Sequence, residues 1–117
     1  MSINPPVEWF ASGQIASEKL ENYLLSPTHP LGRHKARLWK SVFGLELGDC
    51  SVLERLIREQ LGQGTPERKA GGGVIRRWGI VIPRFRGPNG NEHPVLTAWA
   101  LEPGADHPHL TTAFPEI

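Results

Sequence analysis

The pattern of hydrophobic and polar residues changes along the chain from a helical period to an alternating one. Residues 17–25, 31–43 and 52–61 carry apolar side chains three or four positions apart, as in helices with one buried face. From residue 75 onward, apolar side chains alternate with polar ones, which is typical of strands. Helices followed by strands predict an α+β fold.

Residues with strong turn preferences mark the ends of these elements. Gly44 is expected to end the second helix, and either Asp49 or Ser51 to begin the third. The sequence Pro-Asn-Gly-Asn at 88–91 predicts a tight hairpin between strands at 75–85 and 95–101. Residues 110–114 form a further strand, and 65–75 are either a flexible connection or a bulged strand start. We therefore expect three N-terminal helices packed on a C-terminal antiparallel meander of three to four strands.

A chain of 117 residues is long enough for one hydrophobic core. We interpret residues 1–16 as an irregular lead-in held to the core by Trp9 and Phe10, 17–64 as the helical half and 65–117 as the sheet half. The single cysteine, Cys50, excludes a disulfide within the chain. No apolar run approaches the roughly 20 residues of a membrane span, and residues 1–6 do not resemble a signal peptide. These features predict one cytoplasmic domain without membrane contact.

Charge is nearly balanced overall, at +1, but unevenly distributed. Residues 29–43 contain four basic residues and no acid, and residues 66–86 contain six basic residues and one acid. Such segments form either one face that binds a polyanion or two unrelated solvated surfaces. The sequence leaves both alternatives open.

The second helix carries the most unusual residues. Its apolar stripe consists of Leu38, Trp39, Val42 and Phe43. If this stripe is extended by one turn toward the N-terminus, it includes His34 and Lys35, and we therefore expect both to lie on the buried side of the helix. A buried ammonium without a partner is unfavourable, so we expect Lys35 to reach solvent, to pair or to line a pocket. Either the two residues tie the helix to the sheet, or they form a cationic phosphate pocket at the helix N-terminus.

The last strand contains two adjacent threonines. Strict alternation places Leu110, Thr112 and Phe114 on the expected core face, and His109, Thr111 and Ala113 on the other. Threonine favours strands, which alone accounts for both residues. The functional alternative is that one hydroxyl donates a hydrogen bond to a phosphate held near the second helix. Thr112 is the better candidate because it shares the expected core face.

These residue types fit RNA cleavage without a cofactor. Histidine transfers protons near neutral pH, and lysine or arginine stabilises the charge of a phosphoryl transition state. His29 and His34 are five residues apart, a poor spacing for a metal pair on one helix, and we predict no metal site. We interpret Cys50 as a passive residue at a helix start rather than as a nucleophile.

Several segments resemble an uncharacterised bacterial domain family. The most specific is His-Pro-Leu-Gly-Arg-His-Lys-Ala at 29–36, a His-Pro-x-Gly-x-His-Lys-Ala motif, joined by Thr-Ala-Trp at 97–99 and the strand at 110–115. Members of this family look like stand-alone proteins or modules of toxin-like chains, and their layout is similar to barnase- and RelE-like ribonuclease toxins. The resemblance implies His34, Lys35 and Thr112 as catalytic positions. The positions expected to support substrate binding are His29, Arg33, Arg37 and Thr111. The chain lacks the Glu-Arg-His set of barnase at comparable positions.

Together these observations predict a metal-independent ribonuclease-like domain of a bacterial toxin–antitoxin or competition system. His34 would act as general acid or base, Lys35 and Arg33 would hold the phosphate, and Thr112 would donate a hydrogen bond. The alternative is a non-enzymatic interaction module, such as an antitoxin, an immunity-like partner or an RNA-binding accessory protein. A third reading gives His34 and Lys35 a purely structural role. The expected partners are RNA or a cognate toxin or antitoxin protein.

Overall fold

The computed structural model describes residues 4–70 and 73–116. Helical elements come first in this part of the chain and strands follow, which confirms the predicted α+β order. The elements are α1 (Val7–Ala11), α2 (Ser17–Lys19), α3 (Arg33–Phe43), α4 (Cys50–Gln60), β1 (Glu67–Lys69), β2 (Arg76–Arg86), β3 (Glu92–Leu101) and β4 (His109–Pro115). A π-helical turn continues α2, and short 3-10 turns precede and follow α4.

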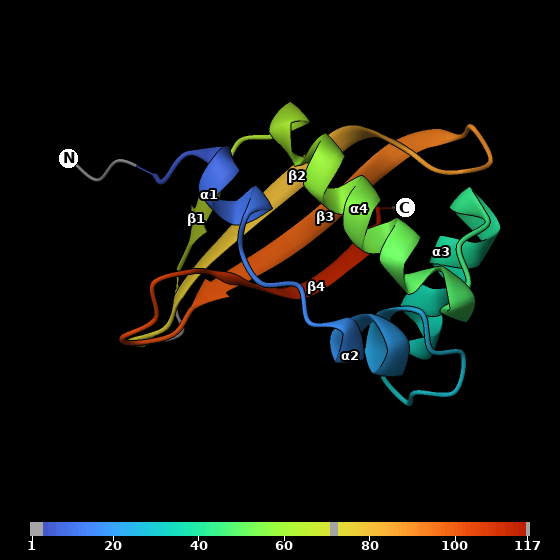
Figure 1. Ribbon diagram of the computed structural model, residues 1–117, viewed down its shortest axis with the longest axis horizontal. Coiled ribbons are helices and arrows are strands. Elements are labelled where there is room, and N and C mark those ends of the chain that lie inside the picture. Colours follow the sequence, from blue (N-terminus) through green and yellow to red (C-terminus); the bar gives the residue numbers. More distant parts are fainter. Residues whose placement is uncertain (1–3, 71–72, 117) are drawn as a thin grey trace.

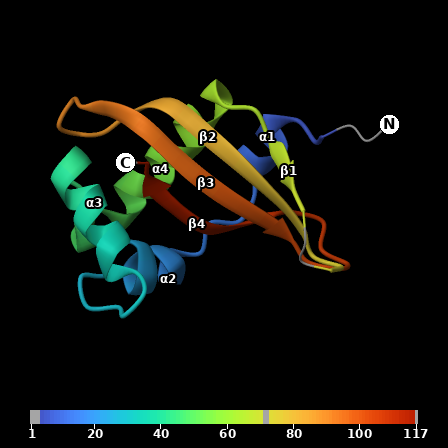
Figure 2. The same ribbon diagram turned by 180° about the vertical axis from the view of Figure 1, so that it is seen from behind.

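The strands form one antiparallel sheet in the order β1-β2-β3-β4, the predicted meander. Helices α1 and α4 lie across one face of this sheet (Figure 1). Seen from behind, β2 and β3 have no helix in front of them, and α2 and α3 lie beside one end of the sheet (Figure 2). An antiparallel sheet covered on one face leaves the other face to solvent or to a ligand.

Aromatic side chains join the helices to the sheet. Phe10 of α1 meets Trp78 of β2 edge to face, with ring centroids 5.4 Å apart. Trp39 and Phe43 of α3 contact Phe85 of β2 at centroid distances of 5.7 and 5.0 Å. All five side chains are buried. The expectation that Phe10 attaches the lead-in to the core is confirmed.

Two predicted turns have the expected backbone. Gly44 ends α3 with a φ of 73°, a left-handed conformation that glycine adopts without strain. Gly90 lies in the hairpin between β2 and β3 with a φ of 87°. Asp49 precedes α4, and its carboxylate accepts a hydrogen bond from the backbone N–H of Glu46.

Two segments differ from the prediction. The lead-in is not irregular throughout, because residues 7–11 form α1. A helix this short has little stability alone and shows no period in the sequence, so packing of Phe10 must stabilise it. Within the connection at 65–75, residues 67–69 pair with β2 as β1. Gly71 and Gly72 of the predicted connection lie outside the described residues.

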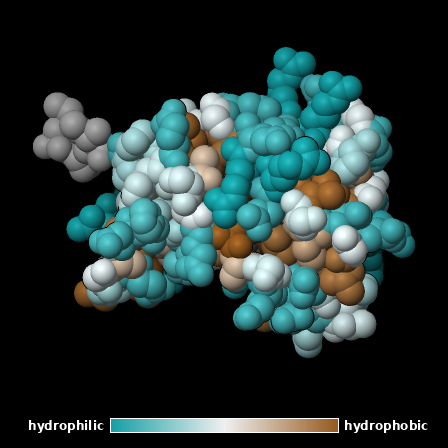
Figure 3. Space-filling view, in the orientation of Figure 1, coloured by the Kyte–Doolittle hydropathy of each residue, from teal (hydrophilic) through white to brown (hydrophobic). Residues whose placement is uncertain are grey.

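Hydrophilic side chains cover much of the helical face, and apolar patches gather toward the end that carries α3 and α4 (Figure 3). Among the helices of the described residues, none is both long enough and apolar enough to cross a membrane.

Candidate functional site

A π-helical turn, Leu20–Leu24, continues α2 and carries Tyr23. The backbone N–H of Leu25 donates to the carbonyl of Leu20, five residues earlier, at 2.9 Å. Leu20 and Leu24 are buried, whereas Tyr23 is only half-buried. Turns of this kind are rare and frequently occur at functional sites, because they re-aim one side chain of a helix.

Lys35 of α3 is aimed at Tyr23. Its ammonium Nζ donates a hydrogen bond to the Tyr23 hydroxyl at 2.7 Å. The same ammonium lies 4.9 Å from the centroid of the Tyr23 ring and 5.5 Å from that of Phe114 on β4. Within the described part of the chain, no carboxylate lies within ion-pair distance of Lys35. The positive charge of Lys35 therefore acts mainly on the phenol.

The pKa of the Tyr23 phenol is lowered from its ordinary value of 10.0, chiefly because Lys35 donates a hydrogen bond to it. Partial burial opposes this shift, while the positive charges of Lys35 and Lys19 and the nearby Thr112 hydroxyl support it. The Lys19 ammonium lies 5.4 Å from the ring centroid. A phenol with a lowered pKa spends more time as phenolate, which is a proton acceptor.

A bulge in β4 brings Thr112 toward Tyr23. Ala98 of β3 pairs with Thr112, but the next residue, Trp99, pairs with Leu110. Thr111 is therefore an extra residue in β4, and its hydroxyl donates to the Ala98 carbonyl at 3.1 Å. This bond occupies the Thr111 hydroxyl in holding the bulge.

Because of the extra residue, the side chains after Thr111 point to the face of the sheet opposite to the one that strict alternation predicts. Leu110 and Ala113 are buried in the core, whereas Thr112 and Phe114 are half-buried on the opposite face of the strand, where Lys35 lies against Phe114. The prediction that Thr112 lies on the core face is therefore wrong, because a one-residue insertion shifts alternation by one position. The Thr112 hydroxyl oxygen is itself enclosed and has no hydrogen-bond partner among the described residues. This hydroxyl is one of the smaller causes of the lowered pKa of the Tyr23 phenol.

His29 and Gly32 hold the start of α3 against Tyr23. The His29 ring nitrogen Nδ1 accepts hydrogen bonds from the backbone N–H groups of Leu31 and Gly32, at 3.0 and 2.9 Å. The His29 ring also meets the Tyr23 ring edge to face, with centroids 5.0 Å apart. A methyl group on Gly32 would lie 2.1 Å from the Tyr23 carbonyl oxygen. These contacts give a structural reason for the spacing of the motif at 29–36.

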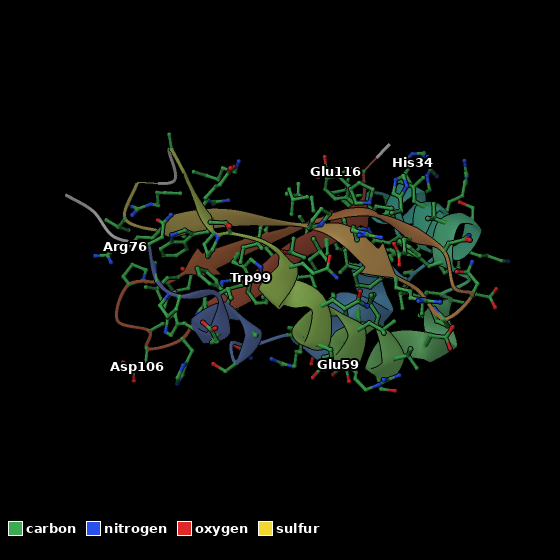
Figure 4. The ribbon with its side chains drawn as sticks, turned by 90° about the horizontal axis from the view of Figure 1, so that it is seen from above. His34, Glu59, Arg76, Trp99, Asp106 and Glu116 are labelled. Carbon is green, nitrogen blue, oxygen red and sulfur yellow. The ribbon has the colours of Figure 1, made fainter. Side chains whose placement is uncertain are left out.

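His34 does not share the position of Lys35. Lys35 precedes Trp39 by four residues, which places it about 40° from that buried side chain, whereas His34 lies about 140° away. Lys35 is half-buried and His34 is exposed, so the prediction that both lie on the buried side is wrong for His34. In Figure 4, His34 lies on the opposite side of the molecule from Glu59 of α4, and therefore toward the uncovered face of the sheet.

Arg33 and Arg37 face away from Lys35. Side chains two positions apart on a helix point about 200° apart, and both arginines line a groove that Lys35 does not reach. The second basic segment extends along β2: Arg76 lies at the opposite end of the molecule from His34 (Figure 4), whereas Arg84 and Arg86 flank Phe85, which contacts Phe43 of α3. The structure thus brings Lys35, Thr112 and His29 of the predicted residues around Tyr23, whereas His34 is exposed on a different side of α3.

Two residues of this cluster are absent from the sequence prediction. The spacing of Tyr23 with Leu20 and Leu24 predicts that it faces the core, and no pattern in the sequence gives Lys19 a role. The only available signal was that Tyr23 is the single tyrosine of the chain and follows Lys19 by four positions. Nothing in the sequence indicates a π-helical turn.

A family model described as Domain of unknown function (DUF6883) matches residues 10–117. No curated protein and no solved structure shows a significant match.

Proposed function

Because the chain belongs to the DUF6883 family, whose description leaves its activity open, we propose a function from the site itself: metal-independent cleavage of RNA, as in a toxin of a bacterial toxin–antitoxin or competition system. The observation that carries this proposal is the 2.7 Å hydrogen bond from Lys35 to a Tyr23 phenol of lowered pKa. The bond places a proton acceptor and a fixed positive charge side by side. Cleavage through the RNA 2′-hydroxyl uses both groups, together with an acid for the leaving 5′-oxygen.

In the proposed reaction, the Tyr23 phenolate accepts the proton of the ribose 2′-hydroxyl. The 2′-oxygen attacks the adjacent phosphorus, and the bond from phosphorus to the 5′-oxygen of the next nucleotide breaks. The leaving 5′-oxygen takes a proton from the His34 imidazolium, which gives a 2′,3′-cyclic phosphate and a 5′-hydroxyl. The Lys35 ammonium stabilises the charge on the phosphoryl oxygens. His34 is assigned this step because histidine transfers protons near neutral pH and its exposed side chain lies on the side of the molecule opposite α4 (Figure 4).

Thr112 has a different proposed role from the one its sequence position suggested. Its hydroxyl oxygen is enclosed, so a phosphate does not reach it without movement of neighbouring side chains. The same hydroxyl lowers the pKa of Tyr23. Thr112 is therefore a positioning residue that supports the phenolate, and this role accounts for a buried hydroxyl without another partner.

The surface around the pair supports access for RNA. Lys35 lies against Phe114 at the β4 edge of the sheet. The neighbouring strands β2 and β3 have no helix in front of them on this side (Figure 2), and His34 lies on the same side of the molecule (Figure 4). Tyr23 and Lys35 are both half-buried, so part of each side chain remains in contact with solvent. A single strand of RNA approaching this face meets the Tyr23–Lys35 pair at the edge formed by β4.

The test is cleavage of a defined single-stranded oligoribonucleotide by the whole protein and two variants. Lys35→Met removes the ammonium but keeps a similar side-chain length, and we expect the rate to fall about a hundredfold. Lys40→Met on the same helix is the matched control, because Lys40 is exposed and pairs with Glu46. Its rate should equal that of the unchanged protein, and a 2′-deoxy nucleotide at the cleaved position should abolish cleavage.

Equal rates for both variants would contradict the proposal. Binding of RNA by the unchanged protein without any cleavage would favour the alternative, a non-enzymatic RNA-binding accessory.

A further inference from the structure

A groove lies on the side of α3 that faces away from Lys35. Its volume is about 340 Å³, and its apolar lining comes from Leu25 and Pro27 before α3, Ala36 within it, and Leu45 and Leu47 after it. Leu47 is 46% exposed, which is unusual for a side chain of this size. The volume is at the lower end of ligand pockets and suits one or two side chains rather than a large cofactor.

Basic side chains line one wall of this groove. Arg33, Arg37 and Lys40 follow one another at intervals of four and three residues, so they share one face of α3. Lys40 forms an ion pair with Glu46 at 3.1 Å. Neither Arg33 nor Arg37 forms an ion pair with another residue in the described ranges. Two guanidinium groups beside an apolar surface are complementary to carboxylates next to an aliphatic side chain.

The lining favours a peptide over a nucleic acid. Single-stranded RNA is held by basic residues together with aromatic rings on which its bases stack. No aromatic side chain lines this groove, whose apolar part is aliphatic. Aliphatic side chains are well suited to receive a leucine or isoleucine of a partner, and the arginines to pair with acids beside it.

We propose that this groove binds an acidic segment of a partner protein. An aliphatic side chain of that segment packs against Leu25, Leu45 and Leu47, and flanking carboxylates pair with Arg33 and Arg37. This interaction goes beyond the proposed RNA cleavage and does not use Tyr23 or Lys35. It also gives Arg33 and Arg37, predicted to bind substrate, a different role.

The test uses a short capped peptide of alternating glutamate and leucine as the probe, with binding measured by calorimetry on the whole protein. Arg37→Glu should weaken binding by about tenfold or more, because it reverses a charge in the groove. Arg55→Glu makes the same change in net charge on α4, where Arg55 is exposed and pairs with Glu59, and it should leave binding unchanged. A peptide with glutamine in place of glutamate should bind much more weakly. Added salt should lower the affinity of the protein for the acidic peptide.

Several results would overturn this proposal. The first is failure of the acidic peptide to bind, and the second is an equal loss of peptide affinity in Arg37→Glu and Arg55→Glu. The third is a glutamine peptide that binds as tightly as the acidic peptide. The groove would be assigned to nucleic acid instead if single-stranded RNA displaced the peptide and Arg37→Glu lost its affinity for the RNA. Lys35→Met should leave peptide affinity unchanged, so failure of the peptide proposal is separable from failure of RNA cleavage.

Discussion

Tyr23 is the residue on which the proposed chemistry depends, and its surroundings explain its ionisation. A lysine ammonium bonds to its oxygen at 2.7 Å, and a second lysine lies beside its ring. The sequence predicted Lys35 as a functional residue because a cation interrupts an apolar stripe. It did not predict Tyr23, since an aromatic residue three positions from one leucine and next to another is usually part of the core.

The single tyrosine of the chain allows a direct test of this arrangement. The phenolate absorbance of the folded protein should titrate with a midpoint below 10.0, the ordinary pKa. Lys35→Met should raise the midpoint because it removes the largest cause of the shift, and Thr112→Val should raise it by less. A midpoint at or above 10 in the unchanged protein, or no response to Lys35→Met, would contradict the assignment.

The lowered pKa of Tyr23 makes the free energy of unfolding depend on pH. Between the lowered native pKa and the ordinary value near 10, the unfolded chain keeps a proton that the folded chain has lost. The free energy of unfolding therefore rises with pH across this window, and the contribution of Tyr23 disappears as pH falls through the native pKa. Urea unfolding at pH values on both sides of the window should show this rise, and Lys35→Met should reduce it.

Two irregular elements, the π-helical turn and the β4 bulge, build the site. Both add a residue to a regular period, and each changes which side chain reaches α3. Elements with a clear period or a specific turn residue were predictable, as the Gly44 cap and the hairpin at 88–91 show. The insertions were not predictable, because the same residues also fit an uninterrupted helix and an alternating strand. This ambiguity placed Thr112 on the wrong face.

Close packing of α3 against the π-helical turn gives a prediction for Gly32. A methyl group at this position would meet the Tyr23 carbonyl oxygen at 2.1 Å, so the backbone must move. Gly32→Ala should lower the free energy of unfolding by about 2 kcal/mol. It should also raise the pKa of Tyr23, since the displacement separates Lys35 from the phenol.

Gly62→Ala is the matched control, because a methyl group there meets no atom within 4 Å. It should leave the Tyr23 midpoint unchanged and alter stability by less than about 1 kcal/mol. Equal effects of the two substitutions on stability would contradict the packing argument.

At the scale of the whole molecule, α3 separates two surfaces of different chemistry. One is the sheet face on which no helix lies in front of β2 and β3 (Figure 2), with Lys35 and Tyr23 against β4 at its edge, and the other is the groove lined by Arg33 and Arg37. The fold thus allows the two surfaces to be occupied at once. The overall charge of +1 gives no indication of this division, because it arises from the direction of individual side chains on one helix.

The measurement that tests the central claim most directly is the cleavage rate of a single-stranded oligoribonucleotide by the unchanged protein and by Tyr23→Phe. This substitution keeps the ring that packs against His29 and removes only the hydroxyl that Lys35 contacts. We expect the unchanged protein to release a 2′,3′-cyclic phosphate, and Tyr23→Phe to do so at least about a hundredfold more slowly while remaining folded. Equal rates for the two proteins would contradict the claim that the Tyr23–Lys35 pair is an active site.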